Sequence, residues 1–192
     1  MKADRKVNCL EKIRDSKNKS AQITDIVFTA LFVAVLVVCS QIIIPFGQVP
    51  VTLQTVGVFL SASVLGARLS GVSVIIYILL GVVGLPVFSG FSSGVGYLLG
   101  PTGGYIIGFF FMAVVVGVIT EKLGKGTGVL AVAMVLGLLV CYAFGTAWFC
   151  VVMKSDFIYG LLWCVVPYVI PDIIKIIFSV FMVKRLSKAV KL

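Results

Sequence analysis

The sequence predicts an all-α integral membrane protein: a bundle of six transmembrane helices with both termini in the cytoplasm. Three observations lead to this prediction. Of the 192 residues, 60% are hydrophobic and 12% are charged, against roughly 45–50% and 25% in soluble domains, and the mean hydropathy is +1.19. Apolar runs recur along the chain, most of them near the length that crosses about 30 Å of hydrocarbon. The basic residues gather between alternate runs, as in multi-pass membrane proteins.

The chain divides into a basic leader, a membrane domain and a basic tail. Residues 1–24 are expected to form a cytoplasmic N-terminal tail, residues 25–185 the six-helix membrane domain, and residues 186–192 a cytoplasmic C-terminal tail. The expected helices occupy 25–44, 53–66, 71–85, 102–120, 129–153 and 157–183. The second and third are short, with a turn expected at 67–70. We therefore expect them to be buried in the bundle or extended by flanking loops, because about 14 residues rise only about 21 Å.

The positions of the basic residues predict the orientation. With six helices, fourteen of the sixteen Lys and Arg residues fall on the side of the leader. On the opposite side there is Lys154, and Lys175 lies inside the last apolar run. Since Lys and Arg favour the cytoplasmic side of a membrane protein, both termini are expected there. The long uncharged loops then face the outside.

The composition also excludes several functions. The chain has no His, which excludes Ser-His-Asp and Cys-His catalysis and His-ligated metals. Its five Cys residues form no CxxC motif, and no G-x-x-x-x-G-K-[ST] loop is present. The basic residues are scattered between apolar runs and do not form a nucleic-acid-binding stripe. We therefore expect no enzyme, no metal, no cofactor and no nucleic-acid partner, and any use of ATP must occur in a partner subunit.

One charged pair lies inside an apolar run. Asp172 and Lys175 occur in PYVIPDIIKIIF, and their spacing of three places both side chains on one helix face. Each charge costs about 2.5–3.5 kcal/mol at the centre of a membrane helix, so such residues commonly mark substrate paths. Pro167 and Pro171 just before the pair interrupt the backbone hydrogen bonds of a helix. A mutually neutralised pair with a purely structural role is the alternative.

Two uncharged loops lie on the outer side. PFGQVP follows the first helix, and PVFSGFSSGVGYLLGP, residues 86–101, follows the third. Glycine lets the backbone approach a ligand closely, and Phe46, Phe88, Phe91 and Tyr97 could cover an apolar ligand. These loops are either a lid over a pocket near the extracellular side or plain connections with glycine-containing turns.

Two patterns of small residues predict close helix contacts. Ala30-xxx-Ala34 lies on the first helix, and Gly100-xxx-Gly104-xxx-Gly108 leads into and along the fourth. Small residues at this spacing let neighbouring helices approach each other. The alanine pair is the better candidate for a partner-docking surface, because it lies near the cytoplasmic end of its helix.

The chain resembles the BioY family, the biotin-specific substrate-binding (S) components of energy-coupling factor (ECF) transporters. The residues that carry this resemblance are PFGQVPVTLQTVGVFLSASVLGARLSG, LLGVVGLPVFSGFSSGVGYLLGPTGGYIIGF and PDIIK, and the similarity runs from about residue 24 to 185. It implies a six-helix bundle in the cell membrane of a prokaryote, with one biotin held at high affinity near the outer face. It also implies a transmembrane coupling (T) subunit docked at Ala30 and Ala34, and two cytoplasmic ATPase subunits that supply energy.

The same resemblance implies the ligand-binding residues. Gly47 and Gln48 in the loop after the first helix, and Asp172 and Lys175 in the sixth, are the expected contributors. Weaker candidates come from the shared motifs, namely Gln54, Gly94, Gly96 and Tyr105. A carboxylate suits the ureido N–H groups of biotin, and an ammonium suits the ureido oxygen or the valerate carboxylate.

Two other functions remain open at this point. A self-sufficient proton-coupled carrier of a small organic solute could use Asp172 as a protonation switch. A membrane scaffold could hold the Asp172–Lys175 pair for structure alone. The first predicts uptake driven by a pH gradient, and the second predicts no ligand binding.

Overall fold

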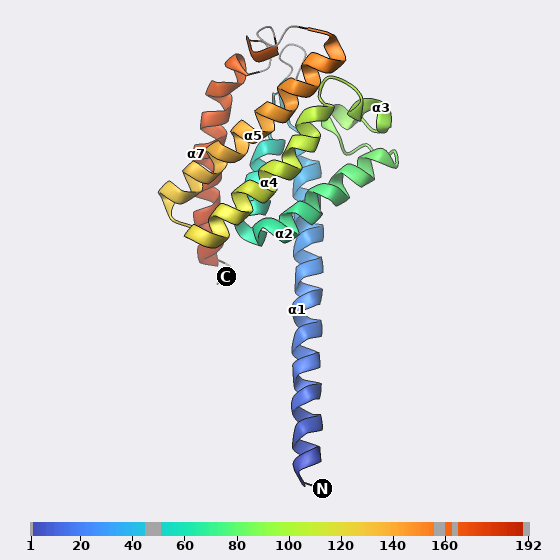
Figure 1. Cartoon of the computed structure of the whole chain (residues 1–192), viewed down its shortest axis with the longest axis vertical. Helices are drawn as coiled ribbons and strands as arrows, with labels where there is room; N and C mark the ends of the chain where they lie inside the picture. Colours follow the sequence, from blue (N-terminus) through green and yellow to red (C-terminus); the bar gives the residue numbers. More distant parts are fainter. Residues whose placement is uncertain (1, 45–50, 156–159, 163–164, 190–192) are drawn as a thin grey trace.

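The computed structural model describes residues 2–44, 51–155, 160–162 and 165–189, and these residues are almost entirely helical (Figure 1). Five described helices are long and apolar enough to cross a membrane. The elements in chain order are α1 (Lys2–Gln41), β1 (Ile43–Ile44), β2 (Val51–Thr52), α2 (Gln54–Val82), η1 (Ser89–Phe91), α3 (Val95–Leu98), α4 (Gly103–Leu123), α5 (Thr127–Met153), η2 (Val166–Tyr168) and α7 (Val169–Ala189).

The all-helical class agrees with the prediction, but the expected count of six spans is not confirmed. The two short runs at 53–66 and 71–85 join into the single element α2, and the expected turn at 67–70 is helical. The break falls instead at Gly66, whose φ of 80° and ψ of −178° lie outside the helical region. Glycine adopts this positive φ without the steric cost of a side chain. The helix restarts at once because the Glu121 carboxylate accepts the Ala67 N–H at 2.9 Å.

The leader is not separated from the first span in secondary structure. α1 runs for 40 residues from Lys2 to Gln41, and its N-terminal half projects beyond the bundle in Figure 1. The polar sequence of the leader is compatible with a solvated helix, whereas Thr29 is the first residue of α1 that the structure describes as buried. The end of α7 lies at the same end of the bundle as the projecting part of α1 (Figure 1).

α4 is the central helix of the bundle. It buries 61% of its most apolar stretch, against 25–39% for the other four candidate spans. Glycines allow this close packing: a side chain at Gly104 would collide with α5 at Trp148, and one at Gly117 would collide with the backbone of α2 at Ala67. A side chain at Gly108 would be in tight contact with Cys141 of α5. The glycine pattern of residues 100–108 therefore serves internal packing at Gly104 and Gly108.

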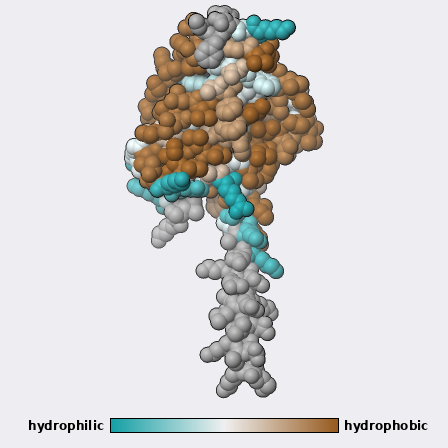
Figure 2. All heavy atoms as spheres, viewed as in Figure 1, coloured by the Kyte–Doolittle hydropathy of each residue, from teal (hydrophilic) through white to brown (hydrophobic). Residues whose placement is uncertain are grey.

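The outer surface of the bundle is apolar. Large hydrophobic side chains are exposed on α1, α2, α4, α5 and α7. On the face seen in Figure 2, hydrophobic residues form a broad brown surface with hydrophilic residues at its lower edge. A surface of this kind is unfavourable in water and matches the hydrocarbon of a bilayer.

The first expected outer loop, residues 45–50, lies outside the described residues, but the segments that flank it are described. β1 and β2 pair antiparallel, with Ile43 opposite Thr52 and Ile44 opposite Val51. Residues 86–101 contain η1 and α3, and the Gly94 N–H donates to the Gly81 carbonyl at 2.7 Å. We call residues 86–101 the lid loop.

Candidate ligand-binding site

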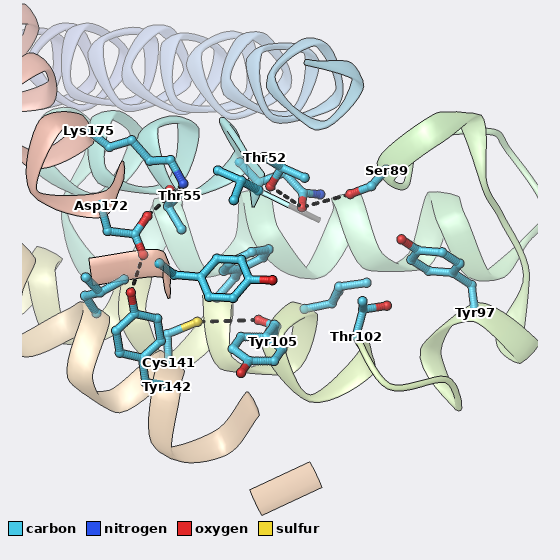
Figure 3. Close-up of a pocket in the computed structure, with 16 residues that line it drawn as sticks. Thr52, Thr55, Ser89, Tyr97, Thr102, Tyr105, Cys141, Tyr142, Asp172 and Lys175 are labelled. Atoms are coloured by element: carbon cyan, nitrogen blue, oxygen red, sulfur yellow. Dashed lines mark hydrogen bonds and ion pairs between the residues drawn. The ribbon is translucent and has the colours of Figure 1, made fainter. Parts of the chain in front are cut away.

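A cavity lies at the end of the bundle opposite the projecting part of α1. Its walls come from β2, the first turn of α2, the lid loop, the first turns of α4 and α7, the middle of α5, and η2 (Figure 3). Hydroxyl, amide and charged groups alternate there with tyrosine rings and aliphatic side chains. Small-molecule sites commonly combine an apolar wall with a few polar groups in this way.

Asp172 and Lys175 both lie in the wall of this cavity. The Lys175 Nζ is 2.7 Å from Asp172 Oδ1, as expected for residues three apart on a helix. Their exposed fractions are 4% and 8%, so both charges are removed from solvent. Tyr142 of α5 donates its hydroxyl hydrogen to Asp172 Oδ2, which fixes the carboxylate from a second helix. The ion pair therefore neutralises itself and still borders open space.

Gln54 lies in the same wall and connects it to the lid loop. Its Oε1 accepts hydrogen bonds from Thr52 at 3.2 Å and Ser89 at 3.3 Å. Its Nε2 donates to the hydroxyl of Tyr77, which in turn donates to the Val87 carbonyl at 3.0 Å. Through these hydrogen bonds the Gln54 amide connects the cavity wall to the lid loop.

Tyr105, another expected site residue, also lines the cavity. Its carbonyl accepts a weak hydrogen bond from the Cys141 thiol at 3.7 Å, which joins α4 to α5 beneath the cavity. A side chain at Gly145 would collide with the Tyr105 ring, so that glycine allows the ring its position.

Two of the other expected site residues do not line this cavity. Gly94 and Gly96 do not line the cavity, and a side chain at either would meet open space. Gly94 adopts a positive φ of 89° at the start of α3, so it shapes the lid loop. Gly47 and Gln48 lie outside the described residues.

The aromatic cover differs from the prediction. Tyr97 is the one expected aromatic residue in the described part of the chain that lines the cavity. Phe88 is buried against Tyr77 and stacks on Tyr97, with ring centroids 5.4 Å apart, whereas Phe91 is exposed. Phe46 lies outside the described residues.

Thr55 is a cavity residue that the sequence did not indicate. Its hydroxyl is buried and has no hydrogen-bond partner among the described residues, and the side chain lines the cavity (Figure 3). A buried hydroxyl without a partner is unfavourable, so it is available for a ligand or a water molecule.

The end of α1 holds the lid loop in place. The Ser40 hydroxyl donates to the Val87 carbonyl at 2.6 Å. The Gln41 amide donates to the Phe88 carbonyl at 3.2 Å and accepts the Phe91 N–H at 3.0 Å. In the sequence, the only indication of this contact is that Ser40 and Gln41 are polar residues near the end of an apolar run.

The described residues contain no cluster of His, Cys, Asp or Glu that could hold a metal ion. Ammonium, carboxylate and hydroxyl groups line one space with aromatic rings, so a ligand with both polar and apolar parts fits this lining.

Comparison with known proteins identifies the family. A sequence model of the BioY family matches residues 14–192. The chain belongs to the BioY family. It is 42% identical over 165 residues to the "Probable biotin transporter BioY" of Pyrococcus horikoshii, an alignment covering 85% of this chain and 96% of that protein. It is 40% identical over 162 residues to the "Biotin transporter BioY" of Thermotoga maritima, covering 82% and 92%.

A solved structure agrees with this membership in the BioY family. The crystal structure of the S-component for biotin from an ECF-type ABC transporter matches with a TM-score of 0.82 and 26% identity, covering 88% of this chain and 93% of that one. The family resemblance noted in the sequence is thus confirmed. The relatives are named for transport and not for catalysis, in agreement with the expectation that the chain is not an enzyme.

Proposed function

We propose that this chain is the S component of an ECF-type transporter and binds one biotin at high affinity in the cavity described above. The observation that carries the proposal is the buried Asp172–Lys175 pair, which borders an open cavity instead of packing against lipid. Support for the ligand's identity comes from the biotin transporters and the biotin S-component to which the chain is similar.

The cavity groups match the chemistry of biotin. The Lys175 ammonium has three N–H groups, of which one is used by Asp172, so two can donate to a ureido or carboxylate oxygen. Each Asp172 oxygen keeps a lone pair that can accept a ureido N–H. The Thr55 hydroxyl adds a donor and an acceptor, while Leu138 and the tyrosine rings contact the apolar ring and chain.

The weaker site candidates take supporting roles in this proposal. Gln54 and Tyr105 shape the cavity wall, Gly94 provides the positive φ at the start of α3 in the lid loop, and Gly96 lies within α3. Gly47 and Gln48 remain proposed ligand contacts from the family motif.

The proposed partners are a transmembrane coupling subunit and two cytoplasmic ATPase subunits. Ala30 and Ala34 are exposed on α1. Ala30 lies in an apolar groove between α1 and the second half of α2, with Val33, Leu69 and Val72 in its walls. Small residues on an exposed helix face let a partner helix approach closely, which supports this face as the docking surface.

We further propose that the protein lies in the plasma membrane of a prokaryote, with both termini cytoplasmic and the cavity facing outward. The excess of Lys and Arg at the end of the bundle where the leader and the C-terminal tail lie supports this orientation. Accessibility of a cysteine introduced at Lys154 to a membrane-impermeant thiol reagent in whole cells tests it, with Lys188→Cys as the inward-facing control.

Titration of the purified chain with biotin tests the proposed ligand. Isothermal titration calorimetry should give one biotin per chain at submicromolar affinity, whereas thiamine, a vitamin of unrelated shape, should give no heat. Absence of a biotin signal from a folded, monodisperse sample would contradict the proposal.

A liposome experiment separates this function from a self-sufficient proton-coupled carrier. The chain alone in proteoliposomes should accumulate no labelled biotin under an inward proton gradient. Gradient-driven uptake by the chain alone would establish the carrier instead. The name of the solved neighbour, an S-component of an ECF-type ABC transporter, favours the ATPase-driven assembly.

A further inference from the structure

One exposed face of α7 changes from apolar to cationic along its length. Residues at spacings of four and three follow one side of the helix. Along this row the exposed side chains are first apolar and then basic: Ile170, Ile174, Ile177, Phe181, Lys184 and Lys188. From residue 170 to 181 the apolar part rises about 16 Å. This matches the roughly 15 Å of hydrocarbon in one leaflet, half of a bilayer core of about 30 Å.

The basic end of this face borders a hollow. Its walls are Lys125 from the turn between α4 and α5, together with Phe181, Lys184, Arg185, Ser187 and Lys188 of α7. The Arg185 guanidinium lies 5.2 Å from the centroid of the Phe181 ring, a cation–π distance that joins the apolar and cationic parts. Four cationic side chains from two segments therefore surround one space.

These cations have no acidic partners in the part of the chain that the structure describes. The one ion pair recorded there is Asp172–Lys175, which is in the cavity wall. Glu121, near the end of α4, is engaged with the Ala67 N–H. Like charges held close together repel each other, and a bound anion would relieve that repulsion.

We propose that this hollow binds the phosphate of an anionic phospholipid, with an acyl chain lying along Phe181, Ile177 and Ile174. The charges recognise the phosphate, and basic hollows on membrane helices at the interface commonly bind such head groups. The continuous apolar row selects a lipid over a soluble phosphate, because it offers a chain-length surface that a soluble anion would not use. The site goes beyond biotin binding and shares no residue with the cavity.

Native mass spectrometry of the purified full chain tests the site. Phosphatidylglycerol and phosphatidylcholine with the same acyl chains are titrated onto the wild type and onto the triple variant Lys184→Gln/Arg185→Gln/Lys188→Gln. The matched control is Lys2→Gln/Arg5→Gln/Lys6→Gln, which removes the same charge from the leader. Each basic residue near an anionic lipid contributes about fivefold, so the triple variant should bind phosphatidylglycerol about 100-fold more weakly. The control should stay within twofold of the wild type.

Several outcomes would overturn the proposal. Equal binding of phosphatidylglycerol by the wild type and the triple variant would remove the site, and so would equal affinity for the two lipids. Displacement by glycerol 3-phosphate at concentrations equal to the lipid would show a soluble-anion site. If the triple variant loses assembly with coupling subunits but keeps lipid binding, the face is a protein interface. The single variant Arg185→Gln, expected to weaken binding about fivefold, serves if the triple variant does not fold.

Discussion

A comparison of a single and a double variant distinguishes a structural role of the Asp172–Lys175 pair from a ligand-binding role. Asp172→Asn leaves the Lys175 ammonium buried without its counter-ion. Loss of one partner of a buried ion pair costs about 3–5 kcal/mol of stability. Asp172→Asn/Lys175→Gln removes both charges and so leaves no uncompensated buried charge, which is the main cost of breaking a buried ion pair. The double variant should therefore recover most of the stability that the single variant loses.

Binding should not recover in the double variant if the pair serves the ligand. Hydrogen bonds to charged groups contribute about 1.5–3 kcal/mol each, so loss of two such bonds weakens biotin binding at least about 100-fold. The assays are isothermal titration calorimetry with biotin and thermal unfolding in detergent. Asp25→Asn/Lys154→Gln is the charge-matched control, since Asp25 and Lys154 are exposed residues outside the cavity. Biotin affinity within threefold of the wild type in the Asp172/Lys175 double variant would refute the site.

Three further predictions follow from other parts of the structure. Ala30→Trp or Ala34→Trp should abolish co-purification with the coupling subunit and spare biotin binding, because Trp blocks the close approach of a partner helix. The control is Val132→Trp on the exposed face of α5. Intact assembly of the Ala30 and Ala34 variants would place the docking face elsewhere. Gln41→Leu removes two hydrogen bonds to the lid loop and should speed biotin release about tenfold in a chase experiment. Gln22→Leu, exposed on the same helix, should not, and an unchanged release rate for Gln41→Leu would mean that the lid loop does not limit release. Gly66→Ala should lower stability by about 1–3 kcal/mol in thermal unfolding, because φ is 80° there and a side chain would strike Glu121. Gly128→Ala in α5, with open space around it, should be nearly neutral, and equal melting of the two variants would contradict the strain at Gly66.

The charged pair could be found from the sequence because ionised groups in an apolar run carry a large energetic cost. The run itself identified Asp172 and Lys175, and their spacing gave the shared face. Tyr142 and Thr55 carried no such signal, since a hydroxyl is common in membrane helices. The Tyr142–Asp172 bond joins residues 30 positions apart and depends on how α5 packs against α7.

The break in α2 shows a different limit. Arg68 in ARLS favoured a turn at 67–70, since a charge between two apolar runs is typical of a loop. The structure keeps these residues helical, because Glu121 of α4 accepts the Ala67 N–H freed at Gly66. That acceptor lies 54 residues away, so local sequence could locate the interruption only approximately.

Because α1 is one continuous helix, a tilt imposed near Ala30 also moves its C-terminal end at Gln41. Ala30 and Gln41 are separated by eleven residues, or about 16 Å of helix. A coupling subunit that tilts α1 by about 10° around Ala30 would therefore carry Gln41 sideways by about 3 Å. That displacement is as large as a hydrogen bond is long, so it would release the Phe88 carbonyl and the Phe91 N–H together. Binding of a partner at the docking face proposed above would thereby weaken the hold of Gln41 on the lid loop at the other end of α1.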